Sequence, residues 1–305
     1  MQLLSFLDPA GQERLGVADR DGTVRDITAP LVGALGPAGG VSLMRRLLTA
    51  GLDPAALSTF AASAGVADVA RLLPPVPDPS KIVAAPVNYR DHQAEMSSDF
   101  AVDGLGVFLK APSSLVGDGA VVRLPYADRR FDQEGELAVV IGRPASHVAP
   151  ADALRYVAGY TCLLDMTMRG GEDRSTRKSF DTFTPAGPRL VTPDEVGDVA
   201  ELELHTWVNG RLRQRADLAD LVWDVPRLIG YISSVMQLLP GDVIATGTPA
   251  GVGEVDDGDE VVVEITRVGR LAATVDATTT AACPTLGRGR GPVPPAALTA
   301  VRERR

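Results

Sequence analysis

The 305-residue chain is 45% hydrophobic and carries a formal net charge of −9, which describes a globular protein with a large core and argues against nucleic acid or anionic membrane as a partner. Three histidines and two cysteines are too few and too scattered for a zinc or copper site or a disulfide framework. The first residues lack a basic leader and the apolar stretch there is short, so we expect a soluble, cytoplasmic protein that acts on a small molecule.

Residues 1–72 are predicted to form a small N-terminal α/β domain. Short strands are expected near residues 3–6, 16–18 and 23–26, followed by helices near 41–50, stopped by Gly51, and near 54–64. Four prolines within residues 74–79 exclude a helix or a central strand. This stretch is therefore predicted to be a stiff connector between two domains.

After the connector, two short segments carry reactive side chains. His92 and Glu95 are three residues apart, so on a helical turn they share a face, and the carboxylate can orient the imidazole as a general base. A simple surface contact explains the same spacing.

Two lysines lie beside apolar segments. Lys110 follows three apolar residues and Lys178 precedes an aromatic stretch, but the simplest interpretation of each is a surface lysine whose aliphatic stem is buried and whose charge is exposed.

Glu134 and Glu136 stand at the start of an apolar run, residues 138–141, that is predicted to be a buried strand. Side chains two residues apart on a strand point to the same face, so the two carboxylates converge. A second apolar run, residues 160–164, ends in Asp165. Three carboxylates at strand ends suit a hard divalent cation such as Mg²⁺ or Mn²⁺, although a solvated strand edge would also explain the glutamate pair alone.

The rest of the chain is predicted to be rich in strands, in keeping with its 31 glycines and 23 prolines. Residues 201–208 alternate and run into an Asn-Gly hairpin signal, and residues 260–266 and 271–275 form a second hairpin. Asp224 is expected to cap a helix with apolar residues at helical spacing as far as Leu239, ended by Pro240 and Gly241. A strand at 243–246 then leads into a glycine-rich loop, and a flexible tail is expected from residue 282 to 305.

Five blocks, taken in order, resemble the fumarylacetoacetate hydrolase family, of the bacterial two-domain type, over roughly residues 80–277. The blocks are Asn88-Tyr89-x-x-His92-x-x-Glu95, Phe108-Leu109-Lys110, Glu134-x-Glu136-Leu137, Asp165-x-x-x-Arg169 with Lys178-Ser179-Phe180-Asp181, and the loop 245–253. The resemblance implies an α+β, β-rich fold, with a mixed β-roll or β-sandwich catalytic domain at residues 80–280, and usually a homodimer.

The resemblance also implies site residues by matching position. One Mg²⁺ or Mn²⁺ per subunit, with Ca²⁺ as a further option, would be held by Glu134, Glu136 and Asp165. The implied catalytic residues are His92 and Glu95 on a mobile segment and Lys178 beside the metal, and the implied substrate-binding residues are Lys110, Arg169, Gly247 and Thr248.

These residues suit hydrolysis of a C–C bond in an acylpyruvate or a fumarylpyruvate-like 1,3-diketo acid. The metal would polarise the carbonyls, and cleavage would leave a metal-bound enolate that the Lys178 charge also stabilises. His92 would take a proton from water, and the products would be a carboxylic acid and pyruvate or a related 2-oxo acid.

Two other outcomes stay open at this point. The same apparatus would serve a decarboxylase, or a keto–enol or double-bond isomerase, of a 2-oxo dicarboxylic acid in aromatic or sugar-acid catabolism. The second alternative is a catalytically inactive relative of the family that only binds metal and ligand. Glu172 also stands where the family commonly has glutamine, and it would repel an anionic substrate unless Arg174 or Arg177 pairs with it.

Overall fold

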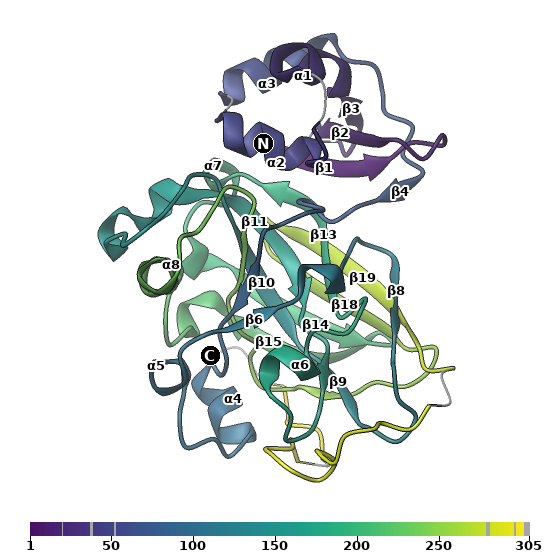
Figure 1. The fold of residues 1–305 in the computed structure, drawn as a ribbon, viewed down its shortest axis with the longest axis vertical. Coiled ribbons are helices and arrows are strands. Elements are labelled where there is room, and N and C mark those ends of the chain that lie inside the picture. Colours follow the sequence, from purple (N-terminus) through teal and green to yellow (C-terminus); the bar gives the residue numbers. More distant parts are fainter. Residues whose placement is uncertain (20, 37–38, 52, 279–280, 296, 302–305) are drawn as a thin grey trace.

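The computed structural model describes all residues of the chain except 20, 37–38, 52, 279–280, 296 and 302–305. Figure 1 shows the N-terminal helices and strands gathered at one end of the molecule and the larger body of sheets below them. The strands are β1 Gln2–Leu7, β2 Glu13–Ala18, β3 Val24–Asp26, β4 Arg71–Leu72, β5 Ile82–Ala84, β6 Phe108–Lys110, β7 Leu115–Val116, β8 Ala120–Arg123, β9 Phe131–Gln133, β10 Gly135–Ile141, β11 Val157–Leu164, β12 Thr167–Met168, β13 Thr184–Val191, β14 Glu203–Val208, β15 Arg211–Asp217, β16 Val243–Ala245, β17 Gly253–Glu254, β18 Glu260–Ile265 and β19 Gly269–Asp276.

In the described part of the chain, helices are fewer than strands. They are α1 Thr28–Leu35, α2 Leu43–Ala50, α3 Pro54–Ser63, α4 Arg90–Glu95, α5 Val102–Leu105, α6 Arg174–Arg177, α7 Pro193–Val196 and α8 Val225–Val235, with 3₁₀ turns η1 Pro112–Ser114, η2 Pro150–Tyr156, η3 Val199–Glu201 and η4 Leu218–Asp220. Within the described part of the chain, no helix has the length and apolar character needed to cross a membrane.

The strands form three sheets. The largest has the order β3-β2-β1-β13-β11-β10-β16-β5-β6, with β4 beside β1 and β7 beside β13. A five-stranded sheet has the order β15-β14-β18-β19-β8, and a small sheet has the order β12-β9-β17. Pairs are mostly antiparallel, but β5 with β16, β8 with β19 and β7 with β13 are parallel. The α+β, β-rich fold class predicted from the sequence is confirmed.

Strand β10 lies at the centre of the largest sheet, between β11 and β16, and every one of its residues is buried. Leu137 and Val139 belong to the core shared with the five-stranded sheet, whereas Ala138 and Val140 belong to the core shared with the N-terminal elements. A strand covered on both faces needs a continuous apolar run, which explains the sequence of residues 137–141. The start of β10 is therefore anchored in the packed core of the fold.

The N-terminal elements mostly follow their local signals. Ser42 caps α2 through its side chain, and Gly51 ends that helix in the left-handed conformation with φ 63°. Asp53 caps α3 in the same way that Ser42 caps α2. Strand β1 pairs with β13 as well as with β2, so this part of the chain continues the large sheet. The division into domains at residue 72 stays a prediction.

One helix is shorter than the sequence predicts. Helix α8 begins at the Asp224 cap as expected but ends at Val235, not at Pro240, because Met236 is extended with φ −150° and ψ 145°. Leu238 instead forms a β-bridge with Ala145, a residue 93 positions earlier in the chain. Apolar spacing cannot reveal this, because a tertiary contact decides it. Helix α1, residues 28–35, had no clear sequence signal and forms without a side-chain cap.

Where it is described, the tail beyond residue 281 contacts the loops that follow β8 and β12 and helix α4, and in Figure 1 it runs in yellow near α4. The Cys283 backbone N–H donates to Asp128, and the Gly171 N–H donates to the carbonyl of Gly287. The Thr299 hydroxyl donates to Glu95 Oε1 at 2.6 Å. The flexibility predicted for residues 282–305 stays a prediction, and positions 296 and 302–305 lie outside the described residues.

Candidate active site

Three carboxylates meet at the mouth of the large sheet. Glu134 lies between β9 and β10, Glu136 lies in β10, and Asp165 directly follows β11, which pairs with β10. The Asp165 N–H donates to the Glu134 carbonyl at 2.8 Å and fixes the two segments to each other. One oxygen from each carboxylate lies within 4.8 Å of the other two. The strand period of two and the antiparallel pairing thus bring together the three residues that the sequence predicted as ligands.

All three carboxylates are buried, with residue exposures of 1–4%. Burial would raise the pKa of Glu134, but the charges of Lys178 and Arg169 outweigh it and lower that pKa. Burial, and then the charge of Asp165, raise the pKa of Glu136 well above its ordinary value. Among the described residues, no lysine or arginine forms an ion pair with Glu136, whose hydrogen bond comes from the Gly247 N–H at 2.7 Å. Glu136 is therefore the one carboxylate of the cluster that no cationic side chain in the described part of the chain neutralises.

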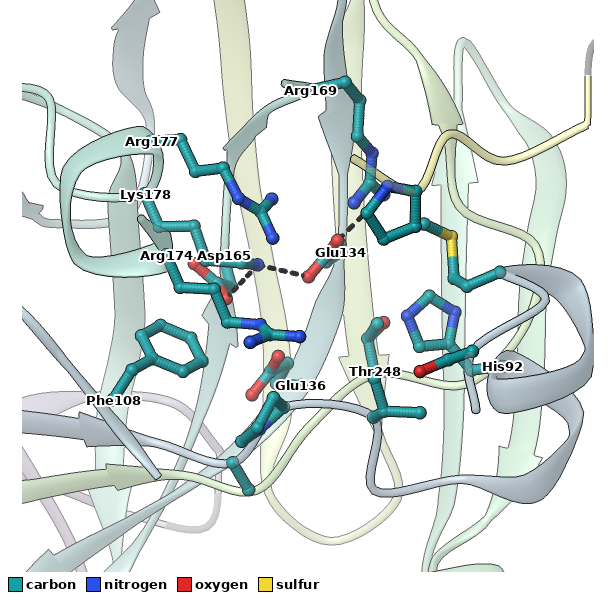
Figure 2. Close-up of a pocket in the computed structure, with 16 residues that line it drawn as sticks. His92, Phe108, Glu134, Glu136, Asp165, Arg169, Arg174, Arg177, Lys178 and Thr248 are labelled. Atoms are coloured by element: carbon teal, nitrogen blue, oxygen red, sulfur yellow. Dashed lines mark hydrogen bonds and ion pairs between the residues drawn. The ribbon is translucent and has the colours of Figure 1, made fainter. Parts of the chain in front are cut away.

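Lysine and arginine side chains satisfy the other two carboxylates, as the dashed lines in Figure 2 show. The Lys178 ammonium donates to Glu134, Asp165 and the Thr167 hydroxyl, each at 2.6 Å. All three N–H groups of this ammonium thus form hydrogen bonds, which fix its positive charge beside the acidic cluster. Strand β6 supplies Phe108, whose ring centre lies 5.6 Å from this ammonium.

Lys110 and Arg169, which the resemblance implied as substrate-binding residues, both contact the carboxylates. Lys110 donates to Asp165 and, at 3.2 Å, to the Phe183 carbonyl; it is fully buried and lies outside the cavity lining. Arg169 does line the cavity, but its Nε and one terminal nitrogen donate to Asp132 and Glu134. The geometry supports a positioning role for Lys110, and the substrate-binding role of both residues stays a prediction.

Asp132 is a site residue that the sequence reasoning missed. It is fully buried and accepts hydrogen bonds from Arg169 at 2.6 Å and Arg130 at 2.7 Å. Asp132 precedes Glu134 by two residues, so the strand period that paired the glutamates would have extended to it. Thr167 was missed as well, because nothing in its local sequence signals a contact with Lys178.

His92 and Glu95 lie on α4 as the spacing predicts. The His92 Nδ1 and Glu95 Oε2 are 2.9 Å apart, and the other carboxylate oxygen accepts from the Gly251 N–H at 2.8 Å and from Thr299. Burial would raise the pKa of Glu95, but the hydrogen bonds from His92 and Thr299 outweigh it and lower that pKa. An ionised Glu95 therefore holds Nδ1, and His92 lines the cavity, where no described residue forms a hydrogen bond with its second nitrogen, Nε2.

The glycine-rich loop after β16 supports the acidic cluster through Glu136. The Gly247 N–H holds Glu136, and Gly247 has φ 97°, with no room for a side chain because Asn88 Cβ would lie 2.7 Å from an added Cβ. The Thr248 hydroxyl lines the cavity but donates to the Gly135 carbonyl and accepts from Gln214. The predicted substrate contacts of Gly247 and Thr248 remain untested.

These groups line one cavity of about 40 Å³ that is open to solvent. Figure 2 shows His92 on one side of the acidic cluster and the side chains of α6 on the other. Glu172, which was expected to repel an anionic substrate, does not line the cavity: both of its oxygens accept from Arg129 at 2.8 Å. Arg174 and Arg177 line the cavity without it.

The residues present fit a hard divalent cation. Three buried carboxylates offer oxygen ligands close to one another, and Glu136 has no cationic side chain of its own among the described residues. Oxygen donors of this kind are those that Mg²⁺ and Mn²⁺ prefer.

Residues 81–276, more than half of the chain, match the family model described as "Fumarylacetoacetate (FAA) hydrolase C-terminal". The chain is 47% identical over 221 residues to a maleylpyruvate hydrolase of Aquipseudomonas alcaligenes, covering 69% of this chain and 77% of that protein. It is 44% identical over 204 residues to a 4-hydroxyphenylacetate degradation bifunctional isomerase/decarboxylase of Escherichia coli, covering 65% of this chain and 47% of that protein.

Among solved structures, the chain is similar to the crystal structure of maleylpyruvate hydrolase from Sphingobium sp. SYK-6 in complex with manganese(II) and pyruvate. The TM-score is 0.79 at 40% identity, and the match covers 92% of this chain and all of that one. The metal named in that complex agrees with the oxygen-rich cluster found here.

Proposed function

Because the chain belongs to the fumarylacetoacetate hydrolase family, we propose that it hydrolyses a C–C bond of a 1,3-diketo 2-oxo acid, an acylpyruvate, to a carboxylic acid and pyruvate. One observation carries this proposal: His92, which is held by Glu95 and can activate water, lines the same cavity as the acidic cluster. The similarity to two maleylpyruvate hydrolases, one of them in complex with pyruvate, supports it.

Glu134, Glu136 and Asp165 would hold one Mg²⁺ or Mn²⁺, which when bound polarises the carbonyl oxygens of the substrate. The remaining steps belong to the side chains around it. Glu95 fixes the His92 ring through Nδ1, so that Nε2 takes a proton from water while the oxygen of that water adds to the distal carbonyl. The C–C bond between that carbonyl and the adjacent CH₂ then breaks.

The electron pair of the broken bond passes to the pyruvate fragment as an enolate, and the proton held at Nε2 is available to complete its methyl group. The Lys178 ammonium is fixed beside the cluster before the reaction starts, so it stabilises this charge without reorganisation. Lys110 and Asp132 act indirectly, by holding Asp165 and Arg169 in place.

The assay that tests the proposal follows an acylpyruvate with the purified, Mn²⁺-loaded protein and analyses the products. Loss of the enol absorbance together with equimolar pyruvate and carboxylic acid is the expected result. Release of CO₂ instead, or a shifted double bond without cleavage, would favour the decarboxylase or isomerase chemistry named for the Escherichia coli relative. No conversion of any kind, with the metal bound, would indicate a relative that only binds ligand.

Replacing Lys178 by methionine is expected to lower kcat by about 10²- to 10³-fold, because a preorganised charge that stabilises the enolate is lost. KM should change little. Lys178→Arg keeps the charge and is expected to recover part of the loss, while Mn²⁺ binding, measured by calorimetry, shows that the site stays loaded. A rise in KM with normal kcat would make Lys178 a substrate-binding residue.

Two further features belong to the proposal. We expect a homodimer, by analogy with the family, and a cytoplasmic location, which fits the two free cysteines Cys162 and Cys283. Analytical ultracentrifugation of the purified protein measures its mass in solution and so tests whether it is a homodimer.

A further inference from the structure

The tail, here the described residues from 281 to 301, contacts the active site although the match to the family model ends at residue 276. Its attachment begins in the loop after β8. The Ala127 N–H donates to the carbonyl of Ala281 at 2.9 Å, and the Cys283 N–H donates to Asp128 at 2.8 Å. The Cys283 thiol also accepts from Arg129 at 3.0 Å. These bonds fix the start of the tail against the catalytic domain.

Glycines let the tail pass close to the loop between β12 and α6. The Gly171 N–H donates to the Gly287 carbonyl at 3.0 Å. A Cβ added at Gly291, where φ is 75°, would lie 2.7 Å from the Gly170 carbonyl oxygen. A Cβ added at Gly171 would lie 2.7 Å from the Cβ of Arg290. Larger residues would clash at these positions, so the glycines of the two segments allow their backbones to meet.

Beyond this crossing, the tail reaches the cavity of the active site. Pro292 is one of the residues that line it. Pro294 is buried, and the Leu298 side chain would lie 3.0 Å from a Cβ added at Gly253. The yellow end of the chain in Figure 1 runs beside α4. The tail thus contributes to the wall of the cavity and continues to the helix that carries His92.

The last contact of the tail is with the catalytic pair. The Thr299 hydroxyl donates to Glu95 Oε1 at 2.6 Å, and the Gly251 N–H donates to the same oxygen at 2.8 Å. The other oxygen, Oε2, lies 2.9 Å from His92 Nδ1. Two donors therefore hold one oxygen of the carboxylate while the other holds the imidazole. The Glu95 side chain is only 1% exposed, so water has little access to replace a lost donor.

Helix α4 needs such support from distant segments. It has six residues, and within the described chain no side chain caps its N-terminus. A helix of this length has little stability of its own, because most of its backbone hydrogen bonds are missing or at an end. Its orientation therefore depends on the contacts that Glu95 and its neighbours make with the rest of the fold.

We propose that Thr299 is a positioning residue of the active site, whose hydroxyl holds Glu95 and, through Glu95, the ring of His92. A hydroxyl suits this task because its hydrogen bond to an ionised carboxylate is stronger than one between neutral groups. The inference rests on the proposed function for the role of His92 as general base. The anchoring of α4 by the tail can be measured without any reaction.

Thr299→Val removes the hydroxyl with little change in shape. It is expected to lower kcat on an acylpyruvate about 5- to 50-fold, the worth of a hydrogen bond to a charged group when a second donor, the Gly251 N–H, remains. KM should change less than about 2-fold, because no contact with the substrate is lost. Thr299→Ser keeps the hydroxyl and should recover kcat to within about 2-fold of the wild-type value.

Two comparisons make this result specific. Glu95→Ala removes the acceptor, so adding Thr299→Val to it should cost less than about 2-fold more. Thr278→Val is the matched control, because Thr278 also donates its hydroxyl to a carboxylate, that of Asp276 at 2.6 Å, but is exposed and outside the cavity lining. It should leave kcat unchanged. A full loss in the Glu95→Ala background, no recovery with serine, or a rise in KM alone would overturn the proposal.

Hydrogen exchange separates this inference from the proposed function. Mass spectrometry of the purified protein is expected to show exchange at least about 3-fold faster at residues 90–96 in Thr299→Val, because α4 opens more often once the tail no longer holds it. Thr278→Val should exchange there as the wild-type protein does. Unchanged exchange in Thr299→Val would overturn the proposal. If the wild-type protein cleaves no acylpyruvate, the proposed hydrolysis fails, and the exchange measurement still decides whether Thr299 holds α4.

Discussion

Glu136→Ala is expected to abolish activity, lowering kcat/KM by more than about 100-fold. Even groups that only support a metal ligand are worth 10- to 100-fold in metal affinity or activity, and Glu136 offers its oxygen directly to the cluster. Mn²⁺ binding measured by calorimetry should weaken in parallel. Excess EDTA should abolish the activity of the wild-type protein in the same assay.

The same change should leave the metal-free protein folded. Burial and the charge of Asp165 raise the pKa of Glu136 well above its ordinary value, so without metal its ionised form is unfavourable and contributes little charge stabilisation to the fold. Urea unfolding of the metal-free proteins measures this. Glu136→Gln repeats the test with little change in shape, and Glu254→Ala, on an exposed side chain, is the control that should change neither property. Unchanged Mn²⁺ affinity in Glu136→Ala would remove Glu136 from the metal site.

His92→Ala is expected to lower kcat on an acylpyruvate by about 10²- to 10⁴-fold, the usual worth of a general base. Glu95→Gln should cost less, because the ring keeps a hydrogen-bonding neighbour at Nδ1 but loses the negative charge that supports its protonated form. Arg90→Ala lies on the same helix with its side chain 63% exposed, so it is the control for disturbance of α4.

The His92 result also separates the chemical alternatives. Decarboxylation needs no hydroxide, so the change would then act through closure of the pocket and alter KM and kcat together. Near-normal turnover of an acylpyruvate by His92→Ala would refute the hydrolytic role of this histidine. It would not affect the proposed metal ligands or the proposed role of Lys178.

Local chemistry was enough to predict much of the fold. The Asn209-Gly210 hairpin forms because both residues take positive φ, 50° and 72°, as such a turn requires. The Asp224 cap and the left-handed Gly51 place helix ends for similarly local reasons. The three carboxylates could also be predicted to meet, because the strand period and the family pattern place them on one edge.

Tertiary structure decided which partner each charged group takes. The Lys110 ammonium donates to Asp165, 55 residues away in sequence. Glu172 was expected to need Arg174 or Arg177, and it pairs with Arg129, 43 residues earlier. The Thr299 contact with Glu95 joins residues 204 positions apart. Sequence spacing predicts neighbours on one helix or strand, whereas these pairings depend on how distant segments pack. For the same reason only the fold could show Arg177 buried and without a carboxylate partner in the described chain.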